Sequence, residues 1–413
     1  MSFQLLPSVS GAVVKDTLRW GSAQDVGLDP FYVGAFADVA IVNTTFYEGS
    51  NHSIMPGAVT LAVQDGVVVS HQATGYAYKY ADYNGTYLPW WEMIPMTRDT
   101  IFDLASLTKM FTGTVAGTLM DEGLLTLNAS AASYVPLFAS NGKGKHNITI
   151  LNLFTHTSGL LPDPVPDLWT NYSSIEERIE AFLTTTPEAP PNTEYVYSDI
   201  NFMTLGHICE VLTNKTLDAL IRERITEPLG MSSTRFNPPE EWKSKIAPTE
   251  YQYGLPDGVG ELEPRRPQPV WGSVHDENAW ALGGVSGHAG LFSTAYDLAI
   301  FSQMILNNGT YGGKRILQPE TVDKFFYNYN TAFPGDDHGL AWEINQYYWG
   351  GLLATNQTIG HTGYTGTSIA IKRDTNTIAI LLTNRVHPNR NWGSNNPARE
   401  AVGTMLAHSL GIF

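Results

Sequence analysis

The chain lacks several features that define whole classes of proteins. Its 413 residues contain one cysteine, Cys209, so no intrachain disulfide can form. Charged residues make up 15% of the chain, and the formal net charge of -16 argues against nucleic acid as a partner. No apolar run is long enough to span a bilayer, so we expect no transmembrane segment. The 43% of hydrophobic residues are nevertheless ample for a large core.

Several catalytic and metal-binding motifs are also missing. The chain has no Gly-x-Ser-x-Gly segment, which disfavours an α/β-hydrolase, and neither a His-Glu-x-x-His segment nor a cluster of cysteines. We therefore expect no metal ion and no other cofactor. Cys209 lies in an apolar helical stretch without activating basic neighbours, so we predict a buried structural thiol.

The segment at 106–109 reads Ser-Leu-Thr-Lys and is followed by apolar residues at helical spacing. A lysine three residues after a serine lies on the same helix face, where a neutral amine can take the serine proton. The pattern arises about once by chance in a chain of this size, and a second copy begins at Ser140 in a glycine-rich turn. Taken alone, Ser106 fits equally well as the cap of a core helix.

Two further segments follow Ser106: Tyr-Ser-Asp at 197–199 and His-Thr-Gly at 361–363. They are accompanied by Leu-Phe-Thr-His-Thr-Ser-Gly-Leu at 153–160, Pro-Leu-Gly-Met at 228–231 and Gly-His-Ala-Gly-Leu at 287–291. In this combination the chain resembles the class C β-lactamase-related serine hydrolases. That group includes penicillin-binding proteins, D-alanyl carboxypeptidases, D-aminopeptidases, family VIII carboxylesterases and fungal acyltransferases. The segment at 287–291 is similar to one in penicillin-binding protein 4B-type carboxypeptidases.

The resemblance implies a β-lactamase/transpeptidase-like fold, an α/β plus all-α architecture in a single catalytic unit over residues 1–413. Apolar runs flank the turns at 65–66 and 374–376, a pattern typical of hairpins from both ends of the chain. We predict an antiparallel sheet flanked by helices, built from residues 20–100 and 304–413, with an inserted helical subdomain at 101–303. The substrate site is expected in the cleft between these two parts.

The resemblance also implies roles for individual residues. Ser106 is expected to be the nucleophile and Lys109 the base. Tyr197 is expected to shuttle protons, and a phenolate there would require the nearby charge of Lys109. The backbone N–H groups of Ser106 and Tyr364 are the expected oxyanion hole, in which each donor contributes about 2.7–4 kcal/mol to the transition state. The candidates for substrate binding are Asp199, His361, Gly363, Tyr364 and His275.

Two of these candidates depart from the family pattern. Asp199 stands where many relatives have asparagine, and a carboxylate next to Lys109 favours the protonated amine. Its alternative role is to cap the helix that follows. His361 stands where β-lactamases have lysine, and a histidine has an ordinary pKa of about 6.5. We therefore expect KM for an acidic substrate to rise as the pH climbs through that value.

These departures favour neutral esters or amides over penicillins. We expect a serine hydrolase that forms an acyl-enzyme on small ester, amide or β-lactam-like substrates, related to the carboxylesterases and β-lactamases. The alternatives are a D-alanyl-D-alanine carboxypeptidase or D-aminopeptidase, an acyltransferase, and a non-catalytic binding protein. The intact Ser106, Lys109 and Tyr197 argue against the last of these.

The chain is also rich in Asn-x-Ser/Thr sequons, with about twice the number expected by chance. They begin at Asn43, Asn51, Asn84, Asn128, Asn147, Asn171, Asn214, Asn308 and Asn356. Together with the low charged content, they favour a secreted protein with N-glycans. The residues at 1–4, Met-Ser-Phe-Gln, show no signal-peptide pattern, so a cytoplasmic location is the alternative.

Overall fold

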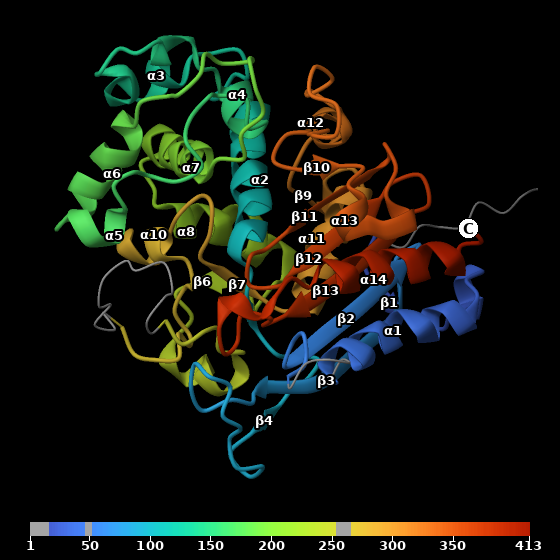
Figure 1. Ribbon diagram of the computed structural model, residues 1–413. Coiled ribbons are helices and arrows are strands. Elements are labelled where there is room, and N and C mark those ends of the chain that lie inside the picture. Colours follow the sequence, from blue (N-terminus) through green and yellow to red (C-terminus); the bar gives the residue numbers. More distant parts are fainter. Residues whose placement is uncertain (1–15, 46–51, 253–265) are drawn as a thin grey trace, which may run out of the picture.

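A computed structural model describes residues 16–45, 52–252 and 266–413. Its main sheet has eight strands in the order β1-β3-β2-β13-β12-β11-β10, with β4 beside β3 (Figure 1). All pairs in it are antiparallel except β1 with β3, so the predicted antiparallel sheet gains one parallel edge strand. The strands are β1 (Arg19–Trp20), β2 (Gly57–Gln64), β3 (Val67–Tyr78), β4 (Ile94–Pro95), β10 (Glu343–Ile344), β11 (Thr358–Thr362), β12 (Ser368–Lys372) and β13 (Thr377–Thr383).

The two predicted hairpins, β2–β3 and β12–β13, lie side by side in the centre of this sheet. Asp65 and Gly66 both have positive φ, 48° and 71°, which is the geometry of a two-residue hairpin turn. Alternate residues of β2 enter different clusters: Val59 and Leu61 join one core, and Ala58 and Ala62 join another. The central strands are therefore buried on both faces.

Helices from both ends of the chain cover this sheet. On one face of the sheet α1 (Pro30–Thr44) and α14 (Asn396–Ser409) lie side by side (Figure 1). On the opposite face α11 (Ala295–Leu306) contacts β13 and β2 and belongs to the larger core cluster. Asp29 caps the start of α1 by accepting a hydrogen bond from Phe31 N, and a proline follows it. Short helices α12 (Pro319–Phe326) and α13 (Tyr347–Gly350) lie near the β10 edge.

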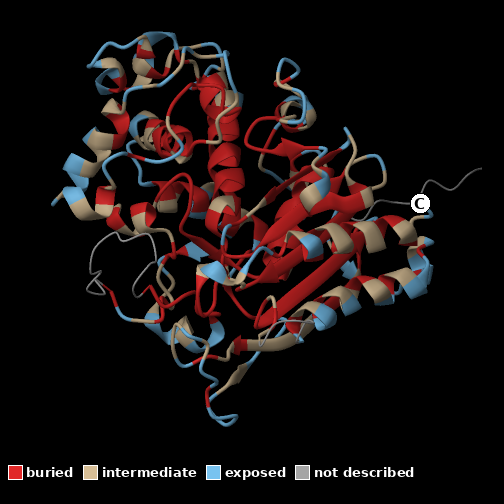
Figure 2. Ribbon diagram, in the orientation of Figure 1, coloured by how far each residue is buried: buried red, intermediate tan, exposed pale blue. Residues whose placement is uncertain are grey.

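Most of the remaining helices come from the middle of the chain. Among them α2 (Thr108–Asp121) is buried at every position from Thr108 to Leu119, and it appears as a continuous red helix in Figure 2. It packs against α7 (Asp199–Thr213), which contains the buried Cys209. The other helices are α3 (Ala131–Tyr134), α4 (Ile150–Phe154), α5 (Leu168–Asn171), α6 (Ile175–Thr184), α8 (Leu217–Ile221), α9 (Glu227–Leu229) and α10 (Glu277–Ala281).

Two small sheets complete the fold. One has the order β5-β7-β6, from Phe102–Asp103, Leu291–Ser293 and Arg235–Phe236, and it supports the segment that leads to Ser106. The other is the hairpin of β8 (Thr310–Tyr311) and β9 (Lys314–Arg315). Within the described ranges, no helix has the length and apolar character needed to cross a membrane.

Candidate active site

Ser106 lies in a tight turn rather than at the cap of a helix. The turn is a 3-10 segment, Ala105–Leu107, and the cap position of α2 is Leu107, which makes no side-chain hydrogen bond. The prediction that Ser106 could serve as a helix cap is therefore wrong. Ala105 has φ of +48°, a strained conformation for a residue with a Cβ atom. The carboxylate of Asp103 accepts a hydrogen bond from Ala105 N at 2.8 Å and so holds this turn in place.

Lys109 follows on the first turn of α2 and is completely buried. Its Nζ lies 2.6 Å from Oδ1 of Asp199 and 3.4 Å from the carbonyl oxygen of His288. Asp199 is the first residue of α7, and Ser198 occupies the cap position, so the proposed capping role of Asp199 is wrong. The aspartate instead supplies the counter-charge for Lys109, and the two form an ion pair beside the Tyr197 ring.

Tyr197 lines the same cavity as Ser106, and its phenol interacts with the Ser106 side chain. Its ring centroid lies 4.7 Å from Lys109 Nζ and 4.5 Å from the ring centroid of His156. Nδ1 of His156 accepts a hydrogen bond from Ser198 N at 3.0 Å, so this histidine has a structural role beside Tyr197. Burial and the charge of Asp199 raise the pKa of Tyr197 far above its usual value, although the Ser106 contact opposes the shift. The charge of Lys109 therefore does not make a phenolate accessible, and the group is a neutral hydroxyl at neutral pH.

A second pair, formed by an aspartate and a histidine, lies beside the Lys109–Asp199 pair. Asp276 Oδ1 is 3.0 Å from His288 Nε2, and ligand atoms of Asp199, Asp276 and His288 all lie within 4.8 Å of one another. Burial together with the charges of Asp199 and Asp276 raises the pKa of Asp163 to about 6. Several carboxylates thus gather around the Lys109–Asp199 pair.

The loop after β11 packs closely against the Ser106 turn. Thr365 Oγ1 donates to Asp103 O at 2.7 Å, and Thr367 Oγ1 donates to Leu104 O at 3.0 Å. A Cβ atom at Gly363 would lie 2.3 Å from Leu104 O, so only glycine permits this approach. These contacts connect the loop of Tyr364 to the turn of Ser106, the two segments whose N–H groups were predicted to form the oxyanion hole.

Neighbouring side chains contact both the backbone carbonyl and the ring of Tyr364. Arg385 donates to Tyr364 O from Nε and Nη2, at 3.1 and 2.8 Å. The His275 ring stacks on the Tyr364 ring with centroids 5.7 Å apart, and Arg390 lies over the same ring. His275 is buried and is not among the described residues that line the cavity at Ser106. It was predicted to bind substrate, but its position is that of a support for Tyr364.

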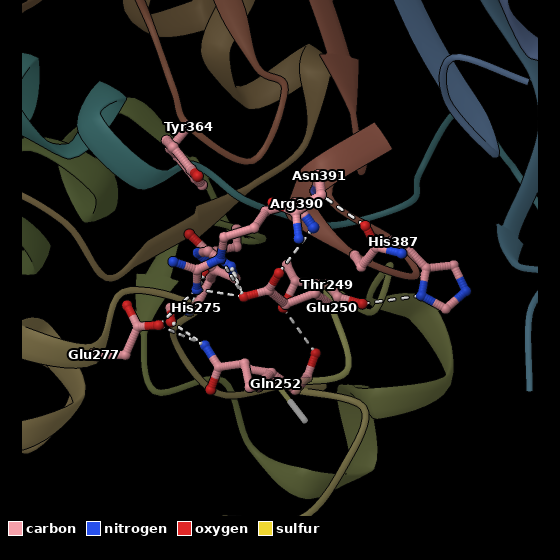
Figure 3. A network of polar contacts seen from close by, with 12 residues as sticks. Thr249, Glu250, Gln252, His275, Glu277, Tyr364, His387, Arg390 and Asn391 are labelled. Carbon is pink, nitrogen blue, oxygen red and sulfur yellow. Dashed lines mark hydrogen bonds and ion pairs between the residues drawn. The ribbon is translucent and has the colours of Figure 1, made fainter. Parts of the chain in front are cut away.

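His275 also belongs to a largely buried ionic network, shown in Figure 3. Glu250 is fully buried and accepts hydrogen bonds from His275 Nε2 at 3.0 Å and from Arg390 Nε at 2.7 Å. Arg390 also pairs with Glu277 at 2.5 Å, and His275 N donates to Asp103 at 2.6 Å. Burial opposes the charge of Glu250, yet the His275 ring and the Arg390 guanidinium lower its pKa to about 2. The network therefore links Tyr364 to the Ser106 turn through His275 and Asp103.

A cavity of about 440 Å³ opens at Ser106. Three of the five predicted substrate-binding residues, His361, Gly363 and Tyr364, line it, whereas Asp199 does not. His361 is 1% exposed, and its Nδ1 contacts Thr362 O at 2.7 Å. Burial, and then the charge of Lys109, lower the pKa of His361 to about 3. The expected change in recognition near pH 6.5 is therefore wrong, because His361 is neutral across the physiological range.

The cavity is also lined by charged residues that the sequence motifs did not indicate. Asp336, Asp337 and Glu343 come from the segment around β10, while Arg385 and Arg399 come from after β13 and from α14. None of them belongs to a short motif with Ser106, and they lie more than 200 positions further along the chain. Only the pairing of β10 with β11, next to His361, brings the acidic segment to the site.

Comparisons with known proteins identify the family of this chain. A family model described as Beta-lactamase matches residues 42–404. A Salmonella typhimurium protein named "Putative D-alanyl-D-alanine carboxypeptidase" is 35% identical over 352 residues, which cover 80% of this chain and 79% of that protein. The chain therefore belongs to the beta-lactamase family, and within that family it is a serine hydrolase.

Solved structures share the fold at lower sequence identity. A penicillin-binding protein homologue from Caulobacter crescentus has a TM-score of 0.69 at 21% identity, covering 93% of this chain and 99% of its own. EstCE1, described as a hydrolase with promiscuous acyltransferase activity, has a TM-score of 0.66 at 21% identity, covering 92% and 99%. These likenesses confirm the predicted β-lactamase/transpeptidase-like fold.

Proposed function

We propose that this enzyme hydrolyses small esters or amides through an acyl-enzyme on Ser106, with Lys109 and Tyr197 as its proton-transfer groups. The observation that carries the proposal is that Ser106 and Tyr197 line one cavity, with Lys109 Nζ 4.7 Å from the Tyr197 ring centroid and paired with Asp199. A serine needs such a partner, because its hydroxyl is a weak nucleophile while it keeps its proton.

Because its phenol is neutral, Tyr197 is suited to relay a proton. As Ser106 Oγ attacks the substrate carbonyl, its proton passes to the Tyr197 oxygen, and the phenol proton passes on to the Lys109–Asp199 pair. For that step Lys109 first shares its own proton with the Asp199 carboxylate, 2.6 Å away. When the tetrahedral intermediate collapses, the same route returns a proton to the leaving alcohol or amine.

The carbonyl oxygen becomes negative during this attack. The N–H groups of Ser106 and Tyr364 are the donors we propose for it, since the two segments are joined by Thr365 and Thr367. Water then attacks the acyl-enzyme and gives its proton to the relay, and Ser106 leaves with a proton to restore the enzyme. If an alcohol or amine takes the place of water, the same steps transfer the acyl group.

A peptidase of the D-alanyl-D-alanine carboxypeptidase type is the second candidate. Two observations favour it: Arg385 and Arg399 line the cavity, and relatives at 35% identity carry that name. An arginine is suited to the terminal carboxylate of a peptide, which a simple ester lacks. Turnover of D-alanyl-D-alanine peptides, p-nitrophenyl butanoate and nitrocefin by the same preparation distinguishes the two functions.

Labelling with a fluorophosphonate tests the nucleophile. We expect one adduct, located by mass spectrometry on the peptide that contains Ser106, and no adduct in Ser106→Ala. Ser140→Ala is the matched control, because it removes the serine of the other Ser-x-x-Lys copy, and it should label like the parent. An adduct on Ser140, or any adduct in Ser106→Ala, would contradict the assignment. Absence of both labelling and turnover would favour a binding protein.

We also propose that the protein is secreted and N-glycosylated. Of the eight sequon asparagines that the structure describes, Asn43 is half-buried and the other seven are exposed, while Asn51 lies outside the described residues. An exposed asparagine is accessible to the glycosylation machinery. Protein from a eukaryotic secretory host should lose mass on treatment with peptide N-glycosidase F. An unchanged mass, or retention of the chain inside its native cell, would contradict this proposal.

A further inference from the structure

A second cavity, also of about 440 Å³, lies beside α8 and the pair of strands β6 and β7 (Figure 1). It shares no described lining residue with the cavity at Ser106. Its floor consists of buried apolar side chains, and the half-buried ring of Trp242 lies next to them; the buried ones are Ile221, Met231, Phe236 and Leu291. The cavity is therefore suited to the apolar part of a small molecule.

One buried polar side chain of this cavity lacks a partner. Thr226 is 5% exposed, and its hydroxyl makes no hydrogen bond with any described residue. Its oxygen is not one of the polar atoms that the protein encloses completely, so it stays accessible from the cavity. Thr226 also ends a π-helical turn, Arg222–Thr226, and such turns are rare and frequent at functional sites. Because a buried hydroxyl without a partner is costly, a ligand that bonds to it is stabilised.

The positive charge of Arg235, an exposed residue of the lining, is also available to a ligand. Its Cζ lies 5.7 Å from the centroid of the Trp242 ring, and its Nε donates to Phe236 O at 3.3 Å. These contacts orient the guanidinium, yet no carboxylate of a described residue lies within 4.0 Å of it. Its two Nη groups make no hydrogen bond with the described residues. A guanidinium with two free N–H groups matches the shape and charge of a carboxylate.

The other charged residues of the lining do not compete for this position. Arg222 is paired with Glu227, whose Oε1 lies 3.3 Å from Arg222 Nε. Asp218 comes from α8, and it also lines a neighbouring cavity of about 190 Å³, so it marks the end where the two cavities meet. Arg235 comes from β6 and stands on the wall that Trp242 shares. An anionic group is therefore expected on the β6 side of the cavity.

Leu291 connects this cavity to the nucleophile. It pairs with Phe236 between β7 and β6, and both residues belong to the lining. The carbonyl oxygen of Leu291 accepts a hydrogen bond from Leu104 N at 2.9 Å, and its N–H donates to Thr108 Oγ1 at 3.1 Å. Leu104 and Thr108 stand two positions before and two positions after Ser106. A molecule that packs against Leu291 therefore restricts the strand that supports the Ser106 turn.

We infer that this cavity is a second binding site, which takes a small carboxylic acid with an apolar body and through Leu291 supports the Ser106 turn. The carboxylate pairs with Arg235, the body packs on the apolar floor, and the Thr226 hydroxyl donates to a polar atom of the body where one is present. Binding is independent of the proposed hydrolysis, whereas the effect on turnover rests on it.

Isothermal titration calorimetry with 5-phenylpentanoate, 5-phenylpentan-1-ol and 5-phenylpentylammonium tests the site. We expect Kd of the acid to be about tenfold lower than Kd of the alcohol or the amine. In Arg235→Gln this advantage should disappear. The compound 5-oxo-5-phenylpentanoate adds a carbonyl that can accept from Thr226, so Thr226→Val should weaken its binding more than that of 5-phenylpentanoate.

Arg98→Gln is the matched control, because it removes an exposed arginine outside the lining of this cavity. It should bind the acid like the parent. Affinity for the acid that Arg235→Gln and Thr226→Val both leave unchanged would show that the acid binds elsewhere, and the inference would be wrong. It would also be wrong if the amine or the alcohol bound as tightly as the acid.

Turnover of p-nitrophenyl butanoate with and without 5-phenylpentanoate tests the connection through Leu291. We expect saturating acid to raise kcat by about twofold or more with little change in KM, and Arg235→Gln to remove this effect. Competitive inhibition alone, or a kcat that does not rise, would overturn the support of the Ser106 turn. If the parent hydrolyses no ester but binds the acid as expected, the proposed function fails while the second binding site stands.

Discussion

Replacement of Glu250 by glutamine tests the buried network behind Tyr364. Glu250 is fully buried, and its carboxylate bonds to His275 and to the backbone and side chain of Arg390. Glu250→Gln keeps the shape of the side chain and removes its charge. Arg390 then keeps only Glu277 as an ionic partner. One carboxylate instead of two balances the positive charge of its guanidinium, which is largely buried.

The size of the effect follows from the pKa of Glu250. The ordinary value is 4.5, and in the folded protein it is about 2. Because the folded pKa is lowered, the ionised carboxylate stabilises the fold above pH 4.5, and that stabilisation is lost as the pH falls towards 2. The ionised carboxylate therefore adds about 3 kcal/mol to the free energy of unfolding at pH 7 and about 1 kcal/mol at pH 3.

Urea denaturation at several pH values measures this difference. We expect Glu250→Gln to lower the free energy of unfolding by about 3 kcal/mol at pH 7, and the gap from the parent to narrow steadily below pH 4.5. Glu240→Gln is the control, because Glu240 pairs with Lys243 while 84% exposed, and a surface pair of this kind contributes about 1 kcal/mol or less. A loss below 1 kcal/mol at pH 7, or a gap that does not change with pH, would refute the reasoning.

Three further predictions concern the active site and its supporting residues. Lys109→Ala and Tyr197→Phe should each lower kcat by several orders of magnitude. Because the two residues act as one unit, the double variant should lose far less activity than the two single losses combined. A near-normal rate in either single variant would assign the base elsewhere. Since His361 has a pKa of about 3, the pH profiles of KM for a carboxylate-bearing and a neutral ester should run parallel from pH 5 to 8, and a divergence near pH 6.5 would show that this histidine titrates there. Asp103→Ala should destabilise the fold by about 2–6 kcal/mol in denaturation, because two backbone N–H groups lose their acceptor, with Asp103→Asn less affected; equal stability of Asp103→Ala and the parent would contradict this.

Elements whose signals are local could be predicted from the sequence. The hairpins β2–β3 and β12–β13 follow from apolar runs on either side of turn residues. The motifs at Ser106, Tyr197 and His361 indicated the family because their order along the chain is specific. In all of these cases the information lies in residues that are neighbours in sequence.

Several features of the site depend on contacts that no short segment contains. Ser106 lies in a strained turn instead of a helix cap, because Asp103 and the loop of Thr365 hold Ala105 and its neighbours. Asp199 pairs with Lys109 instead of capping α7, since α2 and α7 pack together and leave the lysine no water. The charge state of a side chain and its partner depend on this packing, which the residue type alone does not specify.

The sequence by itself determined the class of enzyme, its central hairpins and the identity of its reactive groups, because these depend on residue type and local spacing. Tertiary structure alone decided that His361 is neutral, that His275 supports Tyr364, and that Asp336, Asp337 and Glu343 face the same cavity as Ser106. The reason is physical. Burial changes the free energy of an ionised group, and strand pairing places side by side residues that are hundreds of positions apart.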